Sequence, residues 1–321
     1  MANQDYTQLR GVDELGDDLI GSQLANNLIN FYNWGMLGVG GFFNINITTT
    51  GPYGGNQHQL RPVQDPNYAD GQVWEGFRSD WVWETGVNYN TQPIRVSGVF
   101  VDGAFQPATG VGTYAHHINY PLGRVVFDTA VSTTSTLTAE FSYRWAHFDK
   151  ADSPWMREVM YRSNRVDDAH FLQMGSGNWS QLSSTRVQLP AVFVELVPRR
   201  TFEGKSLGGG QIMNQDVKYH VMAETDWERS KLIDILTYQN EKTIFLYDGN
   251  NINYPLDHRG SPVGDRRMYP DLVEPSGAGL IGYRWKKCRF KDTFTEEVFA
   301  VNQGLFAGSV RTTCEVSMPQ L

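Results

Sequence analysis

Residues 94–103 read IRVSGVFVDG, and this short stretch decides the fold class. Apolar side chains recur at every second position on either side of Gly98, which is the period of a strand with one buried face. Asp102-Gly103 follows directly, and this dipeptide favours the two-residue turns that join antiparallel strands. The stretch therefore predicts a β-hairpin within an antiparallel sheet.

More strands are expected on the C-terminal side of this hairpin. Residues 117–120 and 124–127 are joined by Pro121-Leu122-Gly123, which predicts a second hairpin. Residues 137–145, LTAEFSYRW, then alternate apolar and polar side chains without a break. Short strands at this spacing predict a small β-sandwich-like module, or a curled sheet, over residues 92–150.

The chain before this module combines a helical pattern with irregular sequence. Between residues 17 and 34, apolar side chains fall at three- and four-residue spacing, which predicts an amphipathic helix that ends at Gly35. A short strand is expected over residues 43–47. Residues 48–70 consist largely of Gly, Pro, Asn and Gln without periodicity, which predicts an extended arm that is either disordered or ordered by neighbouring subunits. Residues 1–91 are therefore interpreted as a helix and an assembly arm.

The C-terminal half predicts a mixture of strands and one main helix. The β-branched residues of VQLPAVFVELV, residues 187–197, indicate a strand. Thr225-Asp226-Trp227-Glu228 matches a capping box and predicts the start of a helix. Further strands are expected near residues 216–223, 243–247, 280–290, 296–301 and 310–317. Residues 187–321 are therefore expected to form an α+β domain.

The predicted fold class is α+β, mostly β. Ser153-Pro154 combines a capping hydroxyl with a proline suited to the first helical turn, so residues 151–186 are interpreted as a helical connector. The expected order is an N-terminal helix with its arm, the β module, the connector and the C-terminal α+β domain with one main helix.

Charge and cysteine content exclude several classes of partner. A formal net charge of −8 and a pI of about 5.4 argue against general attraction to nucleic acid. The basic segment WKKCRFK, residues 285–291, is interpreted as a solvated edge strand, because edge lysines block unwanted pairing. Cys288 and Cys314 are the two cysteines, and both are expected to be small core residues of a protein folded in a reducing compartment. Neither a membrane span nor a signal peptide is expected.

The sequence predicts no catalytic, cofactor-binding or metal-binding residues. His116 and His117 are adjacent in an expected strand, so they point to opposite faces and cannot hold one ion together. Gly175-Ser176-Gly177 lacks the full frame of a nucleophile elbow, and Gly208-Gly209-Gly210 lacks the Lys and Ser/Thr of a phosphate loop. Paired carboxylates at expected helix starts are explained by the helix dipole. The protein is therefore expected not to be an enzyme.

The aromatic stretch, defined as residues 72–83 with the sequence QVWEGFRSDWVW, favours an assembly interface. Aromatic side chains bury much area at little entropic cost, which makes them common in interfaces. The alternative is that they pack onto the β module of their own chain. The predicted interface residues from the aromatic stretch and from the apolar face of the N-terminal helix are Trp74, Phe77, Trp81, Trp83, Leu24, Leu28 and Phe31.

Four segments follow an aromatic amphipathic N-terminus, namely GPYGG…RPVQDPNYADGQVWEGFRSDWVWE, YPLGRVVFD, RVQLPAVFVELV and DVKYHVMAETDWERSKLIDIL. In this order, these features resemble virion structural proteins of large contractile-tailed, cyanophage-like bacteriophages. The order of strands around the capped helix is also similar to tail-terminator and neck proteins. The resemblance implies an oligomeric ring at the head-tail junction. Its partners would be other copies of the chain and the neighbouring neck, tail tube or sheath proteins, with at most passing contact with the packaged genome.

Two alternatives to the neck ring stay open. The first is a capsid decoration protein that displays the β module. The second is a baseplate or host-recognition module, because surface Trp and Tyr in a β-sandwich suit glycan binding. In each reading the protein is located in the virion after assembly in the host cytoplasm, and it needs no cofactor.

Overall fold

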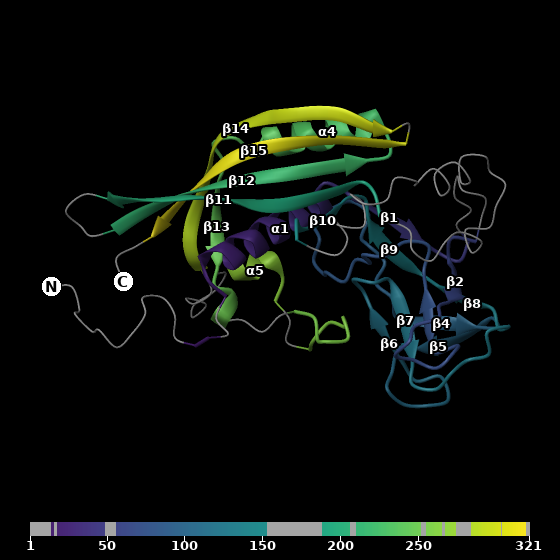
Figure 1. Cartoon of the computed structure of the whole chain (residues 1–321). Coiled ribbons are helices and arrows are strands. Elements are labelled where there is room, and N and C mark those ends of the chain that lie inside the picture. Colours follow the sequence, from purple (N-terminus) through teal and green to yellow (C-terminus); the bar gives the residue numbers. More distant parts are fainter. Residues whose placement is uncertain are drawn as a thin grey trace.

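The computed structural model describes residues 14–15, 18–48, 56–152, 188–205, 210–251, 255–264, 267–273, 284–302 and 304–318. These residues form two sheet-based lobes that meet along one side (Figure 1). The predicted fold class, α+β and mostly β, is confirmed. None of the described helices is long and apolar enough to cross a membrane.

The β module is built from two antiparallel sheets. Seven strands form the first, in the spatial order β5 (Ala104–Pro107), β4 (Gly98–Val101), β8 (Leu137–Ala139), β2 (Gln59–Pro62), β3 (Val73–Glu75), β7 (Arg124–Phe127) and β6 (His116–Asn119). Strands β1 (Phe42–Ile45) and β9 (Phe141–Arg144) form the second. Both predicted hairpins are confirmed. Asp102 and Gly103 turn the first with φ values of 48° and 84°, as a two-residue hairpin turn requires.

Two predictions about this region are wrong. The alternating run over residues 137–145 is two strands in different sheets, because β8 pairs with β2 and β4 whereas β9 pairs with β1. The described residues 56–70 are not a free arm, because β2 lies between β8 and β3 and its Leu60 is buried. The proposed boundary between residues 91 and 92 therefore runs through one sheet.

The second lobe is the large sheet. Its six strands follow the order β10 (His147–Lys150), β11 (Ala191–Lys205), β12 (Gly210–Ala223), β15 (Leu305–Met318), β14 (Arg284–Asn302) and β13 (Thr243–Tyr247). All neighbours are antiparallel except β10 and β11. The strands predicted near 280–290 and 296–301 are one strand of 19 residues, which bends at Asp292, where φ is 51°. WKKCRFK is not an edge, because β13 and β15 pair with it on both sides.

Two helices cover one face of the large sheet. Tyr32 of α1 (Ile20–Gly38) packs edge-on against Tyr219 of β12, with ring centroids 5.5 Å apart. On the same face, Ile233 of α4 (Asp226–Thr237) lies so close to Gly308 of β15 that a Cβ there would come within 2.8 Å of it. Cys288 and Cys314 are buried in this core as free thiols, which confirms the prediction for them. Short helices η3 (Gly249–Asn251) and α5 (Tyr269–Val273) follow β13.

The ends of the two main helices differ in how well the sequence predicts them. The capping box of α4 is confirmed, because the Thr225 hydroxyl accepts from the Glu228 N–H at 3.2 Å and the Glu228 carboxylate accepts from the Thr225 N–H at 3.3 Å. The predicted end of α1 at Gly35 is wrong, since the helix continues to Gly38. It stops where Gly40 adopts a φ of 80° and the next N–H bonds back to Met36. The predicted helical connector, residues 151–186, lies outside the described residues from residue 153 onward.

Candidate functional site

Three of the predicted interface aromatics lie in the core of the β module. Trp74, Phe77 and Trp81 are each at most 1% exposed. The Trp81 ring stacks on Phe141 with centroids 4.4 Å apart, and its indole N–H donates to the Arg78 carbonyl at 2.7 Å. A side chain covered by its own chain offers nothing to a neighbour, so the alternative of packing onto the chain's own β module holds for these three.

The remaining predicted residues divide between the large sheet and the junction. Leu24 and Leu28 of α1 are fully buried in the core of the large sheet. Phe31 is half-buried on the same core, with its ring centroid 5.8 Å from that of Phe290. Trp83 is half-buried and lines a cavity between the two lobes. The structure therefore does not bring these residues together in one surface patch.

The polar residues of the same region form a charged cluster, defined as Asp80, Glu84, Arg144 and His147. The Arg144 guanidinium donates to Asp80 at 3.1 Å and to Glu84 at 2.5 Å. His147 Nδ1 lies 2.8 Å from the second oxygen of Asp80. Arg144 belongs to β9 of the β module, whereas His147 begins β10 of the large sheet. The cluster therefore fastens one lobe to the other.

Neighbouring charges set the protonation of this cluster. Burial opposes a charge on His147, but the charge and hydrogen bond of Asp80, helped by Asp149, outweigh burial and raise its pKa to about 9. Burial likewise opposes the charge on Asp80, yet Arg144 and His147 lower the pKa of that carboxyl below its usual value. The buried pair of Asp80 and His147 is therefore ionised on both sides at neutral pH.

The cluster was not predicted from the sequence. Asp80 and Glu84 stand inside an aromatic segment, and buried carboxylates require cationic partners. The need of a buried carboxylate for a cationic partner was the signal in the sequence, but it does not identify which Arg, Lys or His is that partner. Arg144 lies 60 residues after Glu84, and His147 lies 67 residues after Asp80. No local pattern in the sequence marks either cation.

A second candidate surface is the outer edge of β14. Strand β13 pairs with β14 only as far as Arg289, and no described strand pairs with the outer edge from Phe294 to Asn302. Every side chain from Phe294 to Ala300 is exposed, with Phe294, Val298 and Phe299 each about half exposed. An unpaired edge with exposed apolar side chains is a template for pairing with another chain.

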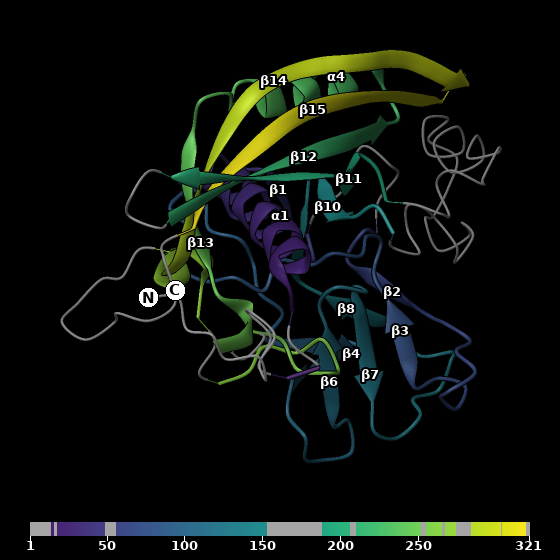
Figure 2. The same cartoon turned by 60° about the vertical axis from the view of Figure 1, so that its left-hand side comes forward.

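The opposite corner of the large sheet has a matching free edge. Strand β10 pairs with β11 only as far as Val194, and beyond that point no strand in the described part of the chain lies against the outer edge of β11. The residues from Pro198 to Gly204 are exposed, including Arg199, Arg200 and Phe202. Figures 1 and 2 show both ends of the sheet extending past the helices that cover its middle.

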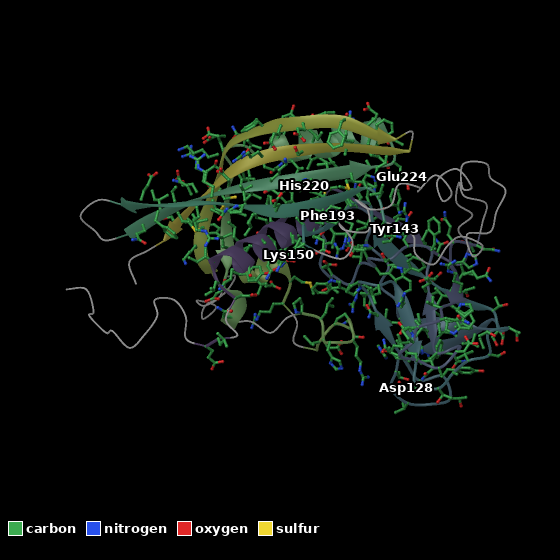
Figure 3. The ribbon with its side chains drawn as sticks, viewed as in Figure 1. Asp128, Tyr143, Lys150, Phe193, His220 and Glu224 are labelled. Carbon is green, nitrogen blue, oxygen red and sulfur yellow. The ribbon has the colours of Figure 1, made fainter. Side chains whose placement is uncertain are left out.

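The outer face of the large sheet is polar and internally paired. Asp216 of β12 accepts a hydrogen bond from Arg311 of β15 at 2.9 Å. Lys218 of β12 forms an ion pair with Glu296 of β14 at 2.8 Å. His220, labelled in Figure 3, bonds to Glu195 of β11 at 2.6 Å. Exposed ion pairs of this kind add little stability, but they keep the face hydrated. The apolar surface is therefore concentrated at the strand ends and not on this face.

No metal site accompanies these surfaces in the described residues. His116 is buried and His117 is half-buried, in the alternating pattern of β6. No group of three or more His, Cys, Asp or Glu side chains among the described residues is arranged to hold a metal ion. Gly175-Ser176-Gly177 and the first two glycines of Gly208-Gly209-Gly210 lie outside the part of the chain that the structure describes.

A scan against protein-family models and a search of curated proteins both found no match for this chain.

Proposed function

We propose that this chain is a structural component of a bacteriophage virion that assembles as a ring at the neck or upper tail and joins head to tail. The observation that carries the proposal is the pair of unpaired strand edges at opposite corners of one sheet. Two different edges on one protomer permit a heterologous contact, in which β14 of one copy pairs with β11 of the next. Such contacts generate closed rings when the rotation between copies closes.

The length of the strands supports pairing of their free edges with another copy of the chain. Strands β11, β12, β14 and β15 contain 15, 14, 19 and 14 residues. A 19-residue strand spans roughly 60 Å, whereas the 19-residue helix α1 spans roughly 28 Å. The described helices therefore cannot cover the strand ends, and the exposed residues at those ends face water in a monomer.

Charge on the two edges is complementary. The free edge of β11 carries the exposed Arg199 and Arg200, with Glu203 as its acidic residue. The free edge of β14 carries the exposed Glu297, whereas Glu296 pairs with Lys218 and Arg311 of its own sheet. Opposite charges on two pairing edges favour the β11–β14 contact over the self-contacts β11–β11 and β14–β14. This preference selects head-to-tail assembly, which a ring requires.

The proposal is tested first by the oligomeric state of the full chain. Mass photometry and negative-stain electron microscopy over a range of concentrations should find one closed oligomer of uniform size. A chain that stays monomeric at every concentration contradicts the ring.

The position in the virion is tested on particles from the phage that encodes the chain, by immunogold labelling with an antibody to the chain. Gold at the head-tail junction supports the neck ring, and gold over the head supports a capsid decoration protein. Gold at the tail tip supports a baseplate role. Particles that contain no copy of the chain by mass spectrometry contradict the virion assignment.

A further inference from the structure

A cavity of about 470 Å³, here called the junction cavity, lies where the two lobes meet. It is bounded by α1, by Trp83, by the charged cluster, by β10 with Lys150 (labelled in Figure 3), and by α5. Its volume falls within the roughly 300–1,000 Å³ that is usual for small-molecule sites. The cavity is separate from the free edges of β11 and β14, whose exposed residues do not line it.

Three half-buried aromatic side chains from separate segments are among the residues that line the cavity. Trp34 comes from α1, Trp83 is the last residue of the aromatic stretch, and Tyr269 comes from α5. Each is half-buried, so part of every ring faces the open space. Aromatic rings that stay partly open in a concave site offer flat apolar surfaces to a ligand.

The polar side of α1 supplies amide groups to the same space. Asn26, Asn30 and Asn33 follow the four- and three-residue spacing that places side chains on one stripe of a helix, and all three line the cavity. An asparagine amide both donates and accepts hydrogen bonds, which matches a ligand hydroxyl group. The Asn33 Oδ1 atom is buried without a hydrogen-bond partner in the described structure.

The charges around the cavity are balanced. Its acidic residues are Asp18, Asp80, Glu84 and Asp149, and its basic residues are Arg144, His147, Lys150 and Arg267. Arg144 has a side chain that is only 5% exposed, and its Nη1 atom has no hydrogen-bond partner among the described residues. Equal numbers of opposite charges favour a ligand without net charge, while the unpartnered Arg144 and Asn33 atoms call for a ligand with hydrogen-bonding groups.

We propose that the junction cavity binds a short neutral saccharide. The C–H faces of the sugar rings would pack on Trp34, Trp83 and Tyr269, and the hydroxyl groups would bond to the asparagine amides of α1. A nucleoside or a charged sugar fits this site less well, because the walls combine several separated ring faces with a balanced set of charges. This inference goes beyond the proposed ring, and it does not depend on assembly.

The test measures binding to the full chain by saturation-transfer NMR and isothermal titration calorimetry. The probes are maltotriose and chitotriose, with glucuronic acid and adenosine as the charged and aromatic comparisons. At least one trisaccharide should bind, and Trp83→Ala should weaken it by about tenfold or more. Asn33→Ala should weaken it in the same direction. Trp227→Ala is the matched control, because Trp227 is 64% exposed on α4 and does not line the cavity.

The possible results test the class of ligand and the location of the binding site separately. Failure of both trisaccharides to bind at about 10 mM, or binding of adenosine or glucuronic acid alone, overturns the proposed class of ligand. Binding that is equal in all three variants and the wild type overturns the site. If Trp83→Ala does not fold by near-UV circular dichroism, Asn33→Ala carries the test, because alanine suits an α-helix better than asparagine. A Glu297→Lys variant should bind the sugar as the wild type does, which keeps this result independent of ring assembly.

Discussion

His147 Nδ1 lies 2.8 Å from Asp80 Oδ2, and this contact joins the first strand residue of one lobe to the aromatic stretch of the other. Both side chains are largely buried, with 14% and 19% exposed. Arg144 holds the other oxygen of the same carboxylate, so Asp80 bridges two cations. The junction between the lobes is therefore held by buried ionic contacts, whose strength depends on pH.

Stability should fall as the pH rises above neutral, because His147 has a pKa of about 9 in the folded chain. Because folding raises the pKa of His147, this residue contributes stability that is fully present below its pKa in the unfolded chain, about 6.5. That contribution is lost as the pH rises through about 9. The expected loss is of the order of 2–3 kcal/mol. Urea unfolding of the wild type between pH 6 and pH 10 measures it.

The matched comparison for this pH effect uses two histidine variants. His147→Gln should have a flatter dependence of unfolding free energy on pH, whereas His258→Gln, which changes an exposed side chain, should follow the wild type. Equal slopes for His147→Gln and the wild type contradict the assignment of the pH effect to this residue.

Trp81→Ala should destabilise the chain itself rather than weaken an assembly contact. Trp81 is fully buried, and truncating a buried Trp typically costs about 3–5 kcal/mol. Trp227→Ala, at a 64% exposed position, should change the unfolding free energy by less than about 0.5 kcal/mol. Denaturant unfolding of both variants provides the comparison. A Trp81→Ala protein with wild-type stability and lost oligomerisation would restore the interface interpretation.

Charge reversal on the two free edges should change assembly without changing the fold. Glu297→Lys and Arg199→Glu each place like charges on the proposed β11–β14 contact, so each alone should reduce the fraction of oligomer. The double variant carries opposite charges on the two edges again, and oligomer should return. Mass photometry at one concentration compares the three variants with the wild type.

Asp234→Lys on the exposed side of α4 is the control for these reversals, since it changes a charge on a helix and not on either strand edge. The same loss of oligomer in Asp234→Lys would show that net charge, not edge pairing, controls assembly. Failure of the double variant to recover would rule out the head-to-tail pairing of these two edges.

Asn33→Ala should stabilise the free protein even though it weakens the proposed sugar site. The substitution removes a buried oxygen without a partner and puts a better helix former in α1. The expected gain in unfolding free energy is about 1 kcal/mol. Thermal unfolding in the absence of sugar measures it. A loss of stability of similar size would mean that Asn33 has a structural role in the junction.

Local signals in the sequence predicted much of the fold. Asp102-Gly103 and Pro121-Leu122-Gly123 mark hairpins because turn chemistry is decided by adjacent residues. The Thr225 and Glu228 capping box is decided within four residues in the same way. Gly35 misled the prediction of the α1 end because a glycine inside a helix is tolerated, and only the positive φ of Gly40 ends it.

Relationships between distant segments could not be predicted in this way. The pairing of β2 with β8 joins residues almost 80 positions apart, and it converts an irregular segment into the middle of a sheet. The free edge of β14 was not predicted, because β14 was predicted as two short strands and not as one strand that continues beyond β13. The junction cavity depends on α1, Trp83 and α5 meeting in space, and no periodic pattern records that meeting.

The packing of α1 against β14 and β15 has a consequence for the order of events during synthesis. The ring of Tyr32 stacks near Phe290, so α1 rests on a strand that leaves the ribosome long after the helix itself. Contacts this distant along the chain are slow to form, and they cannot form before β14 has been translated. The outer edge of β14 belongs to the same late segment. A nascent chain therefore cannot pair the outer edge of β14 with a folded neighbouring copy before the strands on which α1 packs have been made.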